Sequence, residues 1–187
     1  MHRSWLTLYH QIELNMIKNP LAYSIISAVL FLTSCSADVV FEEPMPRQLK
    51  LRKNIPSIFH GTWEDENQEL WTVTSDGILK DDELIKNSGD TQIRTDENYL
   101  FLNFRNDEGW ELLVSELDEN TVNVYTIDID DDELIKKLDR LTNLEIAYDD
   151  SGKRSKIKLN PSNREFRKMI KRKLFSYQGS LTRLDHN

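Results

Sequence analysis

The stretch YLFLNFRNDEGWELLVSELDENTVNVYTI, Tyr99 to Ile127, contains the pattern that decides the fold. Aromatic and β-branched residues recur at near period-two spacing over residues 99–104 and 122–127, as they do in strands with two different faces. Turn signals lie between these runs at residues 106–109 and 118–120, and turns of this kind join antiparallel neighbours. The stretch therefore predicts consecutive antiparallel strands.

The same punctuation continues on both sides of this stretch. A strand pattern covers residues 70–74, turn signals follow at 75–77 and 88–90, and a further hairpin joins 144–148 to 156–159. A segment of this length usually makes one domain with a single core. We expect a mainly β (α+β) fold, an antiparallel β-meander, in a single β-rich domain over residues 55–187.

Two segments change from the strand period to the helical period. One begins at Asp131, where Asp130 and Glu133 have the spacing of a capping box and four apolar residues share a face: Leu134, Ile135, Leu138 and Leu141. The other covers residues 163–175, where Ser162 and Glu165 repeat that spacing and the apolar face contains Phe166, Met169, Ile170 and Leu174. We expect two short packed helices and a last strand over residues 178–184.

The start of the predicted domain carries a short motif. Gly61-Thr62-Trp63 resembles the Gly-x-Trp that opens the first strand of lipocalin-like barrels. The resemblance implies a small barrel in which Arg183 stacks on Trp63 across the base, and a lumen in such a barrel would bind a small apolar ligand. The helix expected at Asp131 is not part of that pattern, so a generic β-meander with two packed helices is the favoured alternative.

The N-terminal segment has the organisation of an export signal. The apolar run Leu21 to Leu32 has the length of a signal-peptide h-region and is shorter than the roughly 20 residues that cross a bilayer as a helix. It is followed by Leu32-Thr33-Ser34-Cys35, which contains the single cysteine and resembles the lipobox of bacterial lipoproteins. The resemblance implies cleavage before Cys35 and a diacylglycerol on its thiol. The alternative is a buried helix with Cys35 in the core.

Three further boundaries follow from this interpretation. Residues 1–34 form the predicted signal peptide, and residues 1–15 are an upstream extension because a start at Met16 gives normal signal proportions. Residues 35–54 form the lipidated cysteine and an extended tether, since they contain two prolines and few core residues. Early acids resemble those of Bacteroidetes-type surface lipoproteins: Asp38, Glu42 and Glu43. We expect a lipid anchor in the bacterial outer membrane, with the cell surface favoured over the periplasmic face.

Charge is distributed unevenly along the chain. The net charge of −8 becomes −9 when Arg3, Glu13 and Lys18 leave with the signal, and an acidic chain argues against nucleic acid as a partner. Basic residues nevertheless gather on the second predicted helix, at Arg164, Arg167, Lys168, Lys171, Arg172 and Lys173, after Lys153, Arg154, Lys156 and Lys158. We expect Arg167, Lys168, Lys171 and Arg172 to contact the membrane or an acidic envelope partner. A solvated face balanced by the domain's own acids is the alternative.

Other motifs support less. The acids Asp128, Asp130 and Asp132 alternate as in a calcium loop, but Glu133 and Asp139 stand where that loop needs glycine and glutamate, so we expect no metal and no cofactor. The hexapeptide DDELIK occurs at 81–86 and 131–136 with different flanks, which is too little to predict a repeat.

Catalytic residues are also not indicated. After the signal only His60 and His186 could serve as a histidine base, and the one thiol is predicted to carry lipid, so we assign no catalytic residue. We expect a binding or structural domain of unknown ligand or partner. A membrane-anchored, carboxylate-based hydrolase is the alternative.

Overall fold

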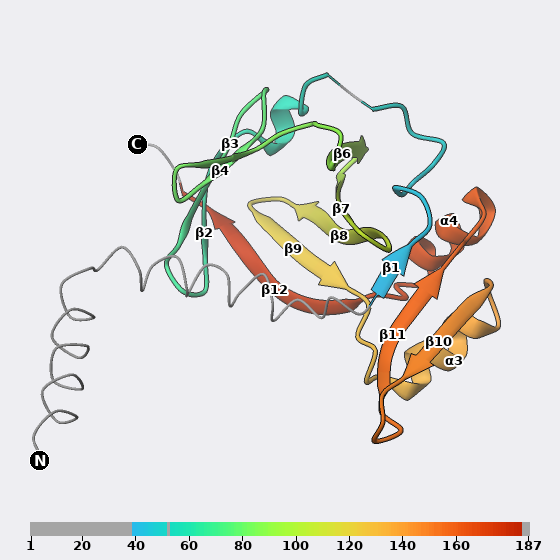
Figure 1. Ribbon diagram of the computed structural model, residues 1–187. Helices are drawn as coiled ribbons and strands as arrows, with labels where there is room; N and C mark the ends of the chain where they lie inside the picture. The colour runs from blue at the N-terminus through green and yellow to red at the C-terminus, as the bar shows by residue number, and fades with distance from the viewer. Residues whose placement is uncertain (1–38, 52, 185–187) are drawn as a thin grey trace, which may run out of the picture. The chain divides into compact units, whose positions relative to one another are not determined.

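The computed structural model describes residues 39–51 and 53–184 (Figure 1). Within these residues a 12-stranded mixed sheet carries two α-helices and one short 3-10 helix. In chain order the elements are β1 (Val39–Phe41), η1 (Ser57–Phe59), β2 (Gly61–Asp65), β3 (Leu70–Val73), β4 (Ile78–Lys80), β5 (Glu83–Ile85), β6 (Thr91–Asp96), β7 (Tyr99–Asn106), β8 (Gly109–Asp118), β9 (Thr121–Thr126), α3 (Asp132–Asp139), β10 (Leu144–Tyr148), β11 (Arg154–Leu159), α4 (Asn163–Lys171) and β12 (Ser176–Arg183).

The central hairpins confirm the predicted antiparallel meander. β7 and β8 pair from Tyr99 opposite Glu116 to Asn106 opposite Gly109, and β8 continues into an antiparallel pair with β9. The turn between β7 and β8 forms because the Asn106 side-chain oxygen accepts hydrogen bonds from the backbone N–H groups of Glu108 and Gly109, both at 2.9 Å. Local side-chain chemistry therefore fixes the register of the longest hairpin.

The sheet folds back on itself without closing into a barrel. Its path runs β10-β11-β1-β8-β9-β12-β2-β3-β4-β5, with β7 beside β8 and β6 beside β7. Residues from β3 to β5 and from β6 to β8 nevertheless pack in one apolar cluster that contains Trp71, Ile78, Ile93, Leu100 and Leu102. Because no pairing joins β5 to β6 among the described strands, the structure shows a folded meander rather than the closed lipocalin-like barrel.

The second core lies under the helices, on the other face of β7 and β8. Phe166 of α4 is at its centre, with ring centroids 6.4 Å from Phe41, 5.9 Å from Phe101 and 6.2 Å from Phe175. Figure 1 shows β12 running from this helical side of the domain to β2. β7 and β8 thus contribute residues to both cores, and β12 connects the helical side of the domain to β2.

The predicted tether is wrong for the segment that begins at Val39. All three residues of β1 are buried, and β1 pairs in parallel with β11 and in antiparallel with β8 at Trp110. Met45, further along, is fully buried. The domain therefore begins before residue 55, since β1 and Met45 are part of it. A three-residue strand that pairs with residues more than 100 positions away has no periodic signal in the sequence.

Both predicted helices are present, with shifted ends. Asp131, not Asp130, caps α3, because its side chain accepts hydrogen bonds from the N–H groups of Glu133 and Leu134. The capping box of Ser162 and Glu165 is present at the start of α4, which ends at Lys171 rather than at residue 175. The chain then turns into β12, which begins at residue 176 rather than 178.

Candidate contact site for an anionic surface

The basic face of α4 consists of four residues on the side of the helix that faces away from the core and two residues that directly follow the helix. Phe166 and Met169 are buried, and six positions before, between and after them are cationic: Arg164, Arg167, Lys168, Lys171, Arg172 and Lys173. Five of these six are exposed and Lys168 is half-buried. The helical period therefore separates an apolar face from a strongly positive one.

The basic residues of β11 and its preceding turn are neutralised within the domain. Their ion pairs are Lys153 with Asp130 at 3.3 Å, Lys158 with Glu42 at 3.6 Å, Arg154 with Asp132, and Lys156 with Glu108. For these four residues the alternative of a face balanced by the domain's own acids is the one observed.

The basic face of α4 differs in this respect. No ion pair within 4.0 Å joins any of its six residues to an acid of the described chain. Its one acid, Glu165, is engaged by the Ser162 backbone N–H, and this hydrogen bond holds the pKa of Glu165 below its usual value. Lys168 and Lys171 lie near the C-terminus of the helix, where positive charges interact favourably with the helix dipole. This interaction stabilises the helix and is a structural role. Five net positive charges nevertheless face solvent over residues 163–173.

The segment that follows α4 leads toward the end of the domain where the chain enters β1. Ser176, three residues beyond the basic face, pairs with Thr126 at the end of β9. β9 borders β8 as far as Val114, and β1 borders the same edge of β8 further on, at Trp110. Because β1 and β9 run in the same direction along that edge, the start of β1 follows the end of β9. Ser176, three residues after Lys173, therefore lies near the start of β1.

The stacking pair expected from the lipocalin resemblance is present on the inner face of the sheet. The Arg183 guanidinium lies 4.4 Å from the Trp63 ring centroid, and its Nη2 donates to the Ile58 carbonyl at 2.5 Å. Trp63 Nε1 donates to the Phe59 carbonyl at 3.0 Å. The pair joins β2 to β12, so its role is structural.

The same cross-strand row continues into a second cation–aromatic contact. Trp71 lies opposite Trp63, and Lys80 lies opposite Trp71 with its Nζ 4.5 Å from that ring. Lys80 also forms an ion pair with Glu69 at 2.6 Å. This second contact is not predicted from the sequence, although period-two positions on adjacent strands are the signal that could have identified it.

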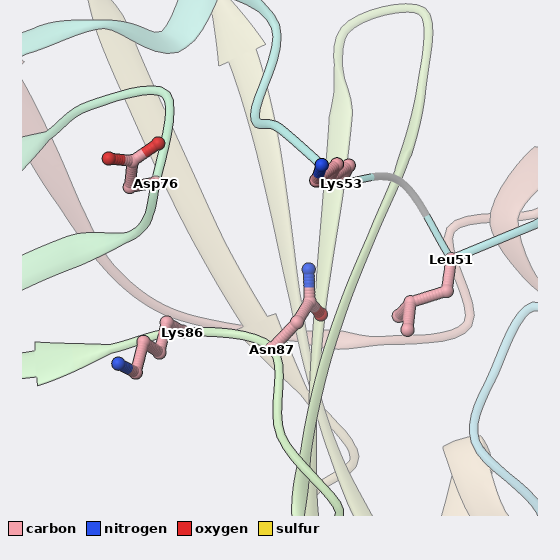
Figure 2. A pocket seen from close by; sticks show the side chains of 5 residues that line it. All are labelled: Leu51, Lys53, Asp76, Lys86 and Asn87. Carbon is pink, nitrogen blue, oxygen red and sulfur yellow. The ribbon is translucent and has the colours of Figure 1, made fainter.

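Two depressions on the surface of the described residues are open to solvent. The first, of about 420 Å³, is lined by Leu51, Lys53, Asp76, Lys86 and Asn87. Figure 2 shows Asp76 and Lys86 on one side of it and Leu51 on the other, with Asn87 between them. The second, of about 490 Å³, lies on the outer face of β3 and β4 and is lined by Gln68, Glu69, Leu70, Thr72, Leu79, Asp81 and Asp82.

The acids considered for calcium have other partners. Asp130 and Asp132 form the ion pairs with Lys153 and Arg154, and the Asp128 side chain accepts from the Asp130 N–H at 2.9 Å. In residues 39–51 and 53–184 no three His, Cys, Asp or Glu side chains are grouped in a way that would hold a metal ion.

Residues 39–51 and 53–184 contain one histidine, His60, and no cysteine. His60 Nε2 lies 2.8 Å from the Ile55 carbonyl oxygen, a backbone contact next to β2. Cys35, His186 and the predicted signal peptide lie outside the described residues.

Comparison with known protein families, with curated proteins and with solved structures finds no match for this chain. Among the described helices, none combines the length and the apolar character that a bilayer-spanning helix requires.

Proposed function

We propose that this protein is a lipid-anchored cell-envelope protein, held at the bacterial outer membrane through Cys35, whose β-rich domain contacts an anionic membrane surface through the basic face of α4. The lipobox resemblance of Leu32-Thr33-Ser34-Cys35 supports the anchor. The observation that carries the contact is the set of six cations that form no ion pair with an acid of the described chain, in a segment that leads to Ser176 near the start of β1. The resemblance of Asp38, Glu42 and Glu43 to the early acids of Bacteroidetes-type surface lipoproteins favours the cell surface.

The short connection between anchor and domain supports a direct contact. Three residues, 36–38, separate Cys35 from β1. An extended chain spans at most about 3.6 Å per residue, so the start of β1 is held roughly 14 Å or less from a lipidated cysteine. The segment after α4 that reaches Ser176 is then also close to the headgroups.

The lipid and the basic face have different roles because their contributions to membrane binding differ in size. Two acyl chains on one cysteine give stable anchoring, whereas a Lys or Arg near an anionic surface adds about 1 kcal/mol. The basic face therefore orients the domain on the membrane, and the lipid retains it there. Salt weakens the contribution of the basic face and leaves that of the lipid unchanged.

Vesicle co-sedimentation tests the orienting contact. The full chain with Cys35→Ser is mixed with neutral phosphatidylcholine vesicles and with vesicles that also contain phosphatidylglycerol. The difference between the two vesicle types is the readout, because the apolar N-terminal run binds both. We expect the pair K168E/K171E to lose most of that difference.

The matched control is K136E/K137E, which reverses two exposed lysines in the last turn of α3. It changes the net charge equally and should retain most of the difference between vesicle types. Equal binding of K168E/K171E and the unmodified chain to anionic vesicles would contradict the proposed contact.

A further inference from the structure

β5 presents a free backbone edge. It is the last strand on the path of the sheet, and no strand of the described chain pairs with its outer edge. A two-residue turn, Asp81-Asp82, precedes it, with φ values of 48° and 65°. Both positive values are those of a type I′ hairpin, which fixes the register of β5 on β4.

The register decides which backbone groups face the open edge. Lys80 lies opposite Glu83 next to the turn, and Leu79 lies opposite Leu84. The residues that flank a two-residue turn exchange backbone hydrogen bonds, and hydrogen-bonded pairs alternate with non-bonded pairs along an antiparallel ladder. The N–H and C=O groups of Leu84 therefore point away from β4, toward the open edge.

Exposed leucines on the outer face of the sheet reach this edge. Leu79 and Leu84 are directly opposite each other with 39% and 44% of their surface exposed. Leu70, 51% exposed, shares this face because Thr72, two residues further along β3, lies opposite Leu79. A free strand edge beside exposed leucines is a site at which another strand adds.

The sequence around Leu84 is self-complementary for an antiparallel partner. If Leu84 of one copy lies opposite Leu84 of another, Asp82 of each lies opposite Lys86 of the other. Asp82 and Lys86 are exposed, and neither has an ion pair in the described chain. Asp82 ends the turn before β5 and Lys86 directly follows β5, so the two opposite charges flank the paired strand at each end, and opposite charges across paired strands stabilise the pair.

The second DDELIK segment shows the contrast. In α3, Asp132 forms an ion pair with Arg154 and Lys136 forms one with Glu133. Asp132 and Lys136 thus have charged partners in the described chain, whereas Asp82 and Lys86 form no ion pair with any residue in that part of the chain.

We propose that a second copy of this chain pairs with β5, antiparallel and about a two-fold axis through Leu84, to form a dimer. The leucine rows of the two copies then continue into each other across the axis. The pairing uses the edge of each copy once, so it closes at two copies. The ladder is short, which places the expected affinity in the micromolar range. This dimer does not depend on the lipid at Cys35.

Charge exchange tests the register of the dimer. Sedimentation of the full chain with Cys35→Ser, in a mild nonionic detergent, measures the dissociation constant without disulfide formation. We expect a dimer that D82K and K86E each weaken about tenfold, since each change places two like-charged pairs across the axis. An equimolar mixture of D82K and K86E should regain the original affinity, because opposite charges again face each other. K136E, the same substitution in α3, should leave the affinity unchanged.

Cross-linking gives a second readout in the same Cys35→Ser background. Leu84→Cys should form a disulfide-linked dimer on mild oxidation, since Cα atoms of a hydrogen-bonded pair lie about 5.5 Å apart. Leu79→Cys, on β4, should not, because three strand spacings of roughly 4.8 Å separate it from its counterpart. A monomer at all concentrations, or no recovery in the D82K and K86E mixture, would overturn the proposal.

Discussion

Asn103 binds both backbone hydrogen-bonding groups of Met45. Its Oδ1 accepts from the Met45 N–H at 2.6 Å, and its Nδ2 donates to the Met45 carbonyl at 2.9 Å. Both residues are fully buried, and Nδ2 also donates to the Gln92 carbonyl at 3.2 Å. The Asn103 side chain thus forms the two backbone hydrogen bonds that a neighbouring strand would form, and it holds the segment after β1 against β7.

Removal of this side chain should destabilise the domain. Asn103→Ala leaves the N–H and C=O of Met45 buried without partners, and we expect the free energy of unfolding to fall by about 2–4 kcal/mol. Urea unfolding followed by tryptophan fluorescence measures the change. Asn67→Ala, at an exposed position between β2 and β3, is the control and should stay within about 0.5 kcal/mol. Equal effects of the two substitutions would show that the contact contributes nothing.

Gly109 tests the docking of β1 on β8 independently. A Cβ at this position would lie 2.5 Å from the Phe41 carbonyl oxygen, and the residue has a φ of 158°. We expect Gly109→Ala to cost about 1–3 kcal/mol, since the clash is with backbone and cannot be relieved by a rotamer change. Gly89→Ala, where a Cβ has open space, is the matched control in the same unfolding experiment. A Gly109→Ala protein as stable as this control would contradict the described position of β1.

The predictable parts of the fold are the parts with local signals. The hairpin around Asn106 and the cap at Ser162 were identified because turn and cap chemistry lies within a few residues. The position of β1 depends on β11 and on Asn103, which are distant in sequence, so residues 39–49 were assigned to a tether. A buried asparagine with a partner 58 residues away has no sequence signal of its own.

The Trp63–Arg183 contact should be measurable by a double-mutant cycle. Arg183→Met keeps most of the alkyl stem and removes the guanidinium, while Trp63→Phe weakens the aromatic face. We expect a coupling of about 1–2 kcal/mol in urea unfolding, because the ring is buried. The cycle of Arg105→Met with Trp110→Phe is the control, since exposed Arg105 lies 5.9 Å from that ring and should couple by less than about 0.5 kcal/mol. If the effects of the Trp63 and Arg183 substitutions were additive, the contact between the two side chains would contribute nothing to stability.

The candidate contact site was only half predictable. The helical period identified the cations of α4, including Lys168 and Lys171, from the sequence alone. Which cations have acid partners was not readable, because Lys156 and Lys158 find Glu108 and Glu42 through the three-dimensional arrangement of β11, β8 and β1. The structure distinguishes the cations of β11, which form ion pairs with acids, from the cations of the basic face of α4.

Glu165 should make part of the stability depend on pH. The Ser162 backbone N–H, followed by the Ser162 hydroxyl, holds the pKa of Glu165 below its ordinary value of 4.5. A depressed carboxyl pKa contributes stability above the unfolded value and loses that contribution as the pH falls through the folded value. Relative to Glu165→Gln, which keeps the capping geometry, we expect an advantage of about 0.5 kcal/mol at pH 7, which is small because solvent screens this carboxylate and which is lost as the pH falls from 4.5 through the lowered folded pKa.

Urea unfolding at pH 7 and pH 3 measures this advantage, with Glu97→Gln, at an exposed turn position, as the control. A difference between Glu165→Gln and the unmodified chain that stays constant from pH 7 to pH 3 would exclude the ionised capping box as its source.

The mass of the N-terminal peptide from membrane-extracted protein tests the proposed lipid anchor most directly. We expect a peptide that begins at Cys35 and carries a diacylglycerol, with Cys35→Ala as the control that lacks this modification. An unmodified N-terminal peptide, uncleaved before Cys35, would contradict the anchor and with it the proposed place of the domain on the membrane.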